Sequence, residues 1–155
     1  MKRPAVILSL VLILAAPAGA QEARTWMFNF DSDTAILQYG TPESDDAVLV
    51  IACDPGKRSM HINEFIGSAS LVPGHPAHLK LGNGTAVVDY AGQTVANEMD
   101  GTVNVEVSIA VDPRLIALLK TGASLTVDIA GKQTAIPLKD AAPHVAEFEK
   151  ACLRR

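Results

Sequence analysis

Three signatures of common enzyme classes are absent from this chain of 155 residues. It has no GxSxG elbow of a serine hydrolase, no phosphate-binding loop and no GxGxxG dinucleotide fingerprint. It also has no CxxC pair, and its two cysteines are too few for a structural zinc site. These absences weigh against the enzymes that such motifs mark, and we expect no cofactor and no catalytic residue that the sequence can identify.

Long apolar runs and an excess of basic charge are also missing. After residue 20, no apolar run approaches the roughly 20 residues that a membrane-spanning helix needs. The chain carries 13 Lys and Arg against 17 Asp and Glu, a formal net charge of −4. The missing apolar runs predict no transmembrane segment in the mature chain. Because an acidic protein repels phosphate backbones, we also expect no nucleic-acid partner.

The first twenty residues have the pattern of a secretory signal. Lys2 and Arg3 precede an apolar run over residues 5–16, and small residues follow in Pro17-Ala18-Gly19-Ala20. Basic, apolar and small-residue regions in this order mark a signal peptide. We therefore expect residues 1–20 to be removed and residues 21–155 to form one β-rich domain in the periplasm or outside the cell.

Two cysteines remain in the expected mature chain, Cys53 and Cys152. Exported compartments are commonly oxidising, and an even cysteine count favours a disulfide. Only one pairing exists, and it would tie the early part of the domain to its C-terminus. The alternative is a pair of free thiols that never meet.

Short segments bounded by Gly, Pro, Asn and Asp predict a succession of strands. They cover residues 25–30, 34–39, 47–53, 58–65, 77–81, 85–90, 93–99, 103–109, 124–129 and 133–138. The continuous apolar run over residues 47–53 predicts a strand buried on both faces. The alternation of apolar and polar residues over 103–109 predicts a strand with one buried and one solvent-exposed face. Asn83-Gly84-Thr85 matches a glycosylation acceptor, but Asn-Gly also favours a hairpin turn, which is our interpretation.

Two short helices are predicted in the C-terminal half. Asp112 is a capping residue, Pro113 suits a first helical position, and Gly122 ends the apolar stripe between them. Residues 142–152 place apolar side chains at spacings of three and four, as on one helix face. The expected fold class is mostly β, an antiparallel sandwich or barrel-like domain with these two helices.

Several segments resemble those of small exported bacterial proteins. They are the early Trp26, the strand Leu49-Val50-Ile51-Ala52-Cys53, the leucine-rich stretch over residues 115–122 and the ending Phe148-Glu149-Lys150-Ala151-Cys152. This layout is similar to the invasion-associated locus B family and to accessory periplasmic proteins associated with type VI secretion. The resemblance implies a disulfide-tied β-domain and carries over no catalytic residue.

Five residues form a candidate binding surface. Trp26, Phe28 and Phe30 alternate on one strand, so they share a face; a core face is our first interpretation, and an exposed aromatic stripe is the alternative. His75 and His78 are the only close histidine pair, and their loop setting favours exposed polar residues over metal ligands. We therefore expect no metal site.

The absent motifs, the export pattern and the resemblance favour a non-enzymatic accessory protein of the cell envelope. It would recognise a protein partner there by surface complementarity or by strand addition at a sheet edge. One alternative is a hydrolase whose site is invisible in sequence, which would join His75 or His78 to a serine or a carboxylate. Another is an inhibitor of an envelope-degrading enzyme, which would present a loop such as residues 72–77.

Overall fold

The structure is a computed structural model that describes residues 23–98 and 100–153, so the expected signal peptide lies outside the described residues. Nine strands and two helices follow one another along this part of the chain. They are β1 (Thr25–Asp31), β2 (Thr34–Gly40), β3 (Ala47–Asp54), β4 (Ser59–Glu64), β5 (Pro76–Gly82), β6 (Val87–Ala96), β7 (Val103–Ala110), α1 (Pro113–Leu119), β8 (Ser124–Ile129), β9 (Lys132–Pro137) and α2 (Ala141–Cys152).

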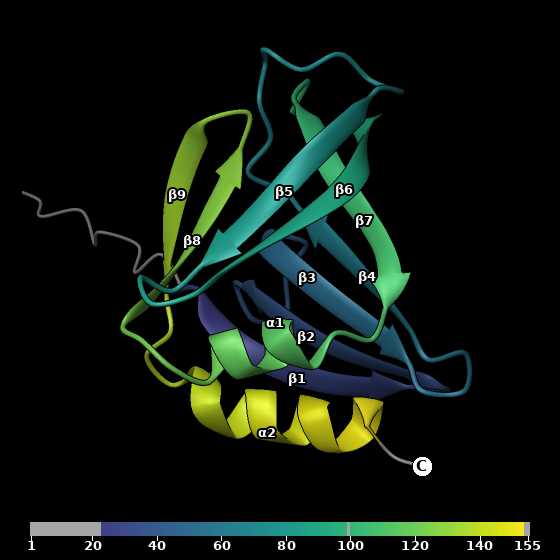
Figure 1. Ribbon diagram of the computed structural model, residues 1–155, viewed down its shortest axis with the longest axis vertical. Coiled ribbons are helices and arrows are strands. Elements are labelled where there is room, and N and C mark those ends of the chain that lie inside the picture. Colours follow the sequence, from purple (N-terminus) through teal and green to yellow (C-terminus); the bar gives the residue numbers. More distant parts are fainter. Residues whose placement is uncertain (1–22, 99, 154–155) are drawn as a thin grey trace, which may run out of the picture.

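All nine strands pair antiparallel in a single sheet. Their order is β1-β2-β3-β4-β7-β6-β5-β8-β9, so the sheet edges are β1 and β9. The sheet curls strongly, with both helices at its lower end in Figure 1. The predicted class, mostly β and antiparallel with two short helices, is confirmed, and the sheet is not closed into a barrel. No helix among the described residues is long and apolar enough to cross a bilayer.

One predicted turn is instead the middle of a strand. Residues 85–90 and 93–99 were expected to be separate strands around Ala91-Gly92, but β6 runs unbroken from Val87 to Ala96. It pairs with β5 through Gln93 and with β7 from Gln93 onward. Glycine is required at this change of partner, because a Cβ on Gly92 would lie 2.4 Å from the carbonyl oxygen of Glu106.

β3 differs from its prediction in burial. Leu49, Ile51 and Cys53 are fully buried, whereas Val50 and Ala52 between them are only partly buried. The expectation of two buried faces was wrong. The reason is that the hydrophobic core fills the inner face of the sheet, so the residues on the outer face keep contact with solvent.

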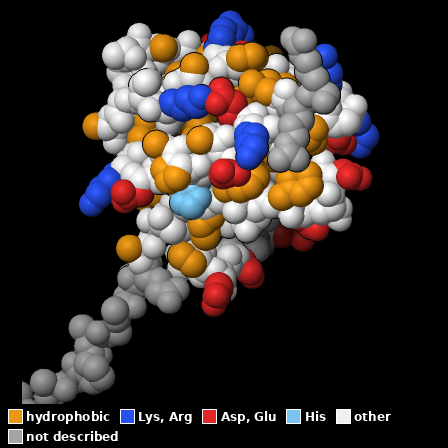
Figure 2. All heavy atoms as spheres, turned by 90° about the horizontal axis from the view of Figure 1, so that it is seen from below, with side chains coloured by type: hydrophobic (Ala, Val, Ile, Leu, Met, Phe, Trp, Pro, Cys, Tyr) orange, Lys and Arg blue, Asp and Glu red, His pale blue; other side chains and the backbone are white. Residues whose placement is uncertain are grey.

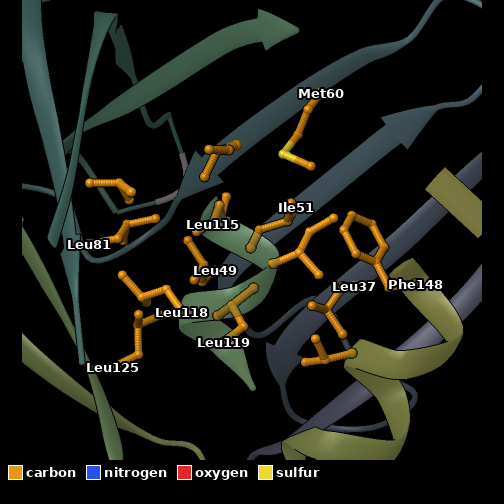
Figure 3. Close-up of a cluster of buried hydrophobic side chains, with 14 of the residues drawn as sticks. Leu37, Leu49, Ile51, Met60, Leu81, Leu115, Leu118, Leu119, Leu125 and Phe148 are labelled. Atoms are coloured by element: carbon orange, nitrogen blue, oxygen red, sulfur yellow. The ribbon is translucent and has the colours of Figure 1, made fainter. Parts of the chain in front are cut away.

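The inner face of the sheet and both helices share one hydrophobic core (Figure 3). The core side chains drawn there come from distant parts of the chain and include Leu37, Leu49, Ile51, Met60, Leu81, Leu115, Leu118, Leu119, Leu125 and Phe148. α1 begins as predicted, with the carboxylate of Asp112 accepting the N–H of Arg114 at 2.9 Å and Pro113 in the first turn. Burying each large apolar side chain contributes about 1.5–3 kcal/mol to stability.

Side chains hold the edge strand β9 at both of its ends. The indole Nε1 of Trp26 on β1 donates to the carbonyl oxygen of Pro137 at 2.7 Å, and the ring of Tyr39 lies 5.5 Å from the Trp26 ring. At the other end of β9, the ammonium of Lys132 donates to the carbonyl oxygen of Gly67 at 2.9 Å. These contacts restrain β9 on the side where no strand pairs with it.

We expect Trp26→Phe to lower the free energy of unfolding by about 1–3 kcal/mol, because it leaves the Pro137 carbonyl without its buried donor. Urea denaturation of the oxidised protein measures this. Tyr39→Phe is the matched control, since the Tyr39 hydroxyl makes no hydrogen bond with a described residue, and it should change stability by less than about 0.5 kcal/mol. Equal effects of the two substitutions would show that the indole hydrogen bond is not what holds the edges together.

Candidate functional site

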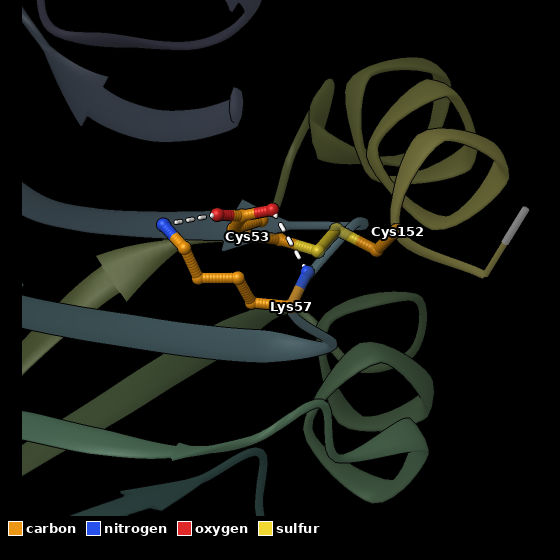
Figure 4. Close-up of a disulfide and its surroundings, with 4 residues drawn as sticks. Cys53, Lys57 and Cys152 are labelled. Atoms are coloured by element: carbon orange, nitrogen blue, oxygen red, sulfur yellow. Dashed lines mark hydrogen bonds and ion pairs between the residues drawn. A yellow bond between two sulfur atoms is a disulfide. The ribbon is translucent and has the colours of Figure 1, made fainter. Parts of the chain in front are cut away.

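A disulfide joins β3 to the end of α2 (Figure 4). Cys53 and Cys152 are bonded, with their Cα atoms 5.8 Å apart and 99 residues apart in sequence. The predicted pairing is therefore confirmed, and the alternative of two free thiols is not. In the chain-entropy model, a loop of this length contributes about 4–5 kcal/mol to stability. Both cysteines are buried, so the disulfide is part of the hydrophobic core.

The turn that follows Cys53 is held by its own side chains (Figure 4). The Asp54 carboxylate accepts the backbone N–H of Lys57 at 3.0 Å and pairs with the Lys57 ammonium at 2.9 Å. These bonds hold the pKa of the Asp54 carboxyl below its usual value. Because the disulfide at Cys53 directly precedes it, this surface turn is restrained both covalently and by its own hydrogen bonds.

Two hollows flank this turn. Hollow A, of about 620 Å³, lies between the turn, the connection from β7 to α1 and the end of α2, and its lining includes Arg58 and Leu153. Hollow B, of about 530 Å³, lies between the turn and the end of β1, and its lining includes Phe30 and Lys57. We call this region the disulfide end; it comprises the residues that line the two hollows.

Phe30 and Leu153 are unusually exposed for apolar residues at the disulfide end, at 54% and 43% of their surfaces. Exposed large apolar side chains beside hollows are typical of partner-binding surfaces. The three aromatic residues of β1 do not share this exposure. Trp26 is 1% exposed and belongs to the core, and Phe28 packs partly against the core. The three aromatic side chains therefore do not form an exposed stripe, because among them only Phe30 is largely exposed.

The histidine pair lies elsewhere. His75 directly precedes β5, whose first residues lie near the top of Figure 1, whereas the end of α2 lies near the bottom. The His75 backbone N–H donates to the hydroxyl of Thr94 at 2.8 Å. Nδ1 of His78 lies 2.8 Å from the Asp89 carboxylate, and both side chains are well exposed. The five residues of the candidate surface therefore do not form one site.

Among the described residues, no group of three or more His, Cys, Asp or Glu side chains is arranged to hold a metal ion. A histidine–serine pair does occur on the outer face of the sheet. His61 on β4 and Ser108 on β7 are register partners, with Nδ1 and Oγ 2.9 Å apart. Ser108 also lines a hollow of about 470 Å³. Sequence reasoning missed this pair because the two residues are 47 positions apart and only the strand register brings them together.

Glu64 is a fully buried acid at the end of β4. Its carboxylate accepts the backbone N–H groups of Ile66 at 2.9 Å, Gly67 at 3.0 Å and Val105 at 2.6 Å. The Val105 N–H is one that the ladder between β4 and β7 would otherwise use, so the side chain extends the sheet where the strands part. Burial raises the pKa of the Glu64 carboxyl, against the opposing effect of these three donors. With 0% exposure, this carboxylate has a structural role.

Asn83 is also structural, as its turn position suggested. Its Nδ2 donates to the carbonyl oxygens of Leu118 and Thr121, both at 3.1 Å. Its Oδ1 accepts the N–H groups of Thr85 and Ala86 at 3.1 and 3.0 Å. The amide thus joins the turn between β5 and β6 to the end of α1, and it is not free to carry a glycan.

We expect Glu64→Gln to destabilise the protein, because both oxygens of the carboxyl accept backbone N–H groups and keep acceptor capacity even when the group is protonated, whereas an amide nitrogen cannot accept. A group whose pKa is raised by folding contributes stability that is present below its unfolded pKa and is lost as the pH rises through the folded pKa. The stability difference between wild type and variant should therefore be about 1–3 kcal/mol at pH 4 and smaller at pH 7.

Urea denaturation at both pH values measures that difference. Acids such as Asp112, whose pKa is lowered to about 2 by the Arg114 guanidinium, affect wild type and variant alike and cancel in the comparison. Glu106→Gln is the control, since Glu106 is exposed, and it should shift stability by less than about 0.5 kcal/mol at either pH. A Glu64→Gln effect that grows between pH 4 and pH 7 would contradict the sign of the pKa shift.

Comparison with known proteins adds no relative. No protein-family model matches the chain, no curated protein matches it, and no solved structure matches it. The similarity to the two exported families thus remains an expectation from the sequence.

Proposed function

We propose that the protein is exported to the cell envelope and acts there by binding a protein partner through the disulfide end, without catalysing a reaction. The N-terminal pattern of residues 1–20 supports export, and a disulfide suits an oxidising compartment outside the cytoplasm. The resemblance to exported accessory proteins points to the same role.

One observation carries the proposal: a rigid turn separates two hollows, and an exposed aromatic ring lies at one of them. The disulfide fixes Cys53, and the two contacts between Asp54 and Lys57 hold the turn over residues 54–57. The surface is therefore ordered before it meets a partner. A preorganised surface loses less conformational entropy on binding. Phe30 is the natural anchor residue, since aromatic side chains that enter pockets dominate many interfaces.

The charge pattern fits a protein partner. Seen from below, the molecule shows apolar patches between acidic and basic side chains, with no broad area of one sign (Figure 2). Apolar contacts surrounded by polar side chains are the usual anatomy of a protein–protein interface. The formal net charge of −4 gives no attraction to nucleic acid.

We expect Phe30→Ser to reduce the capture of a specific partner by at least about fivefold, because it removes the exposed aromatic ring beside hollow B that would contact the partner. The experiment is chemical cross-linking of residues 21–155 in an envelope extract, followed by mass spectrometry. Val87→Ser is the matched control, since Val87 is 68% exposed and lies on β6 away from the disulfide end. It should leave capture unchanged.

Equal capture by wild type and Phe30→Ser would exclude the disulfide end as the binding surface.

Hydrolysis is the second candidate function, favoured by the contact between His61 and Ser108. A turnover that Ser108→Ala abolishes in the folded protein would replace binding as the proposal. Capture of an envelope-degrading enzyme that is inhibited on binding would favour the inhibitor alternative, with residues 72–77 as the loop to test.

A further inference from the structure

The two edges of the sheet differ in how far their backbones are left open. Asp31 and Thr34 close the hairpin between β1 and β2 around a two-residue turn, and such closing residues form a hydrogen-bonded pair. Hydrogen-bonded and non-hydrogen-bonded pairs alternate along antiparallel strands. The N–H and C=O groups of Phe28 and Phe30 therefore point away from β2, and no described residue forms a hydrogen bond with them.

β9 is protected against strand addition. Its first residue, Lys132, carries a charge and bonds the carbonyl of Gly67. Its last residue, Pro137, has no N–H, and its carbonyl accepts the indole of Trp26. Lysine and proline on an edge strand are two of the devices by which proteins prevent edge pairing.

β1 lacks these devices over its second half. Residues 28–31 contain no proline and no basic side chain, and the register with β2 is regular from Thr25 to Asp31, with no bulge. Asn29, Phe30 and Asp31 are exposed. An exposed, regular and partly apolar edge is a ready template for another strand. The side chain of Phe30 also lines hollow B, so a strand added here would lie beside the disulfide end.

The charges at this end of β1 indicate the chemistry of the added strand. Asp31 and Asp33 are exposed, and neither forms an ion pair with a described residue. The nearby ammonium of Lys57 is already paired with Asp54. A strand carrying lysine or arginine would supply the missing positive charge. A second copy of β1 would not, because Thr25–Asp31 contains no basic residue and repeats the acid.

We propose that the edge of β1 at Phe28 and Phe30 binds an extended segment of a partner protein that alternates apolar residues with lysine or arginine. The segment forms backbone hydrogen bonds to both residues, and its basic side chains face Asp31 and Asp33. This inference rests on the proposed binding function and assigns to it both the mode of contact and the kind of partner segment.

The test uses a blocked synthetic peptide in which lysine and valine alternate, with a glutamate–valine peptide as control. Hydrogen exchange followed by NMR on residues 21–155 should show slower exchange of the Phe28 and Phe30 amides with the lysine peptide only. Protection at Gln133 and Ala135 of β9, or at neither edge, would overturn the assignment. Protection that rises with protein concentration without peptide would show that a second copy occupies the edge, and it would also overturn the proposal.

Two substitutions at one position separate the backbone from the side chain. Phe30→Pro removes an N–H that makes no bond within the sheet, whereas Phe30→Thr removes the ring and keeps the N–H. Loss of one backbone hydrogen bond should weaken peptide binding about tenfold in Phe30→Pro relative to Phe30→Thr. Thermal denaturation checks that both variants fold. If Phe30→Pro does not fold, the exchange data on the wild-type protein still test the proposal.

The outcomes distinguish this inference from the function on which it rests. Equal peptide affinity in the two variants would remove strand addition but leave side-chain recognition at the disulfide end intact. Partner capture that falls further in Phe30→Pro than in Phe30→Ser and Phe30→Thr, which both keep the N–H, would support strand addition by the natural partner.

Discussion

The disulfide between Cys53 and Cys152 fixes the position of the helix that completes the core. An open, curled sheet leaves its inner face exposed unless another element covers it, and α2 provides this cover beside β1 and β2. Its buried residues include Val145 and Phe148, and an ion pair between Lys120 and Glu149 links it to the end of α1. The covalent bond holds the last residue of α2 against β3, so one constraint maintains both the core and the surface that we assign to binding.

The same arrangement explains why function is assigned to one end of the molecule. Around the bond, a tight turn, the end of β1 and the end of α2 meet and leave two hollows. One edge strand, β9, is held by Trp26 and Lys132, whereas the end of β1 is left open. A rigid support next to an unpaired strand edge is the combination that strand addition requires, since the added segment alone loses conformational entropy.

Local sequence patterns were sufficient to predict most elements of this fold. Turn residues such as Asp54-Pro55-Gly56 and the capping pair Asp112-Pro113 act on their immediate neighbours, so their effects can be read directly. Strand pairing is not local. The continuity of β6 through Gly92 depends on a change of partner from β5 to β7, which neither segment reveals by itself.

The candidate site shows the same division. The cysteine pairing was predicted from the even count and the export pattern, but burial along β1 did not follow from alternation. Trp26 and Phe30 alternate on one strand, yet Trp26 meets the end of β9 and is buried, while Phe30 lies near the other end of β1, where it lines hollow B and is exposed. The contacts of Glu64, and of His61 with Ser108, likewise depend on the register between β4 and β7.

Hydrogen exchange on the Cys53→Ala/Cys152→Ala double variant tests the central claim most directly. If the disulfide fixes α2 and the disulfide end, amides in the second half of α2 and in the turn at residues 54–58 should lose protection, while β5, β6 and β8 keep theirs. Unchanged protection of α2 would contradict the account, because apolar packing alone would then hold the helix. Uniform loss across the sheet would also contradict it, since the bond would then support the whole domain and not this end.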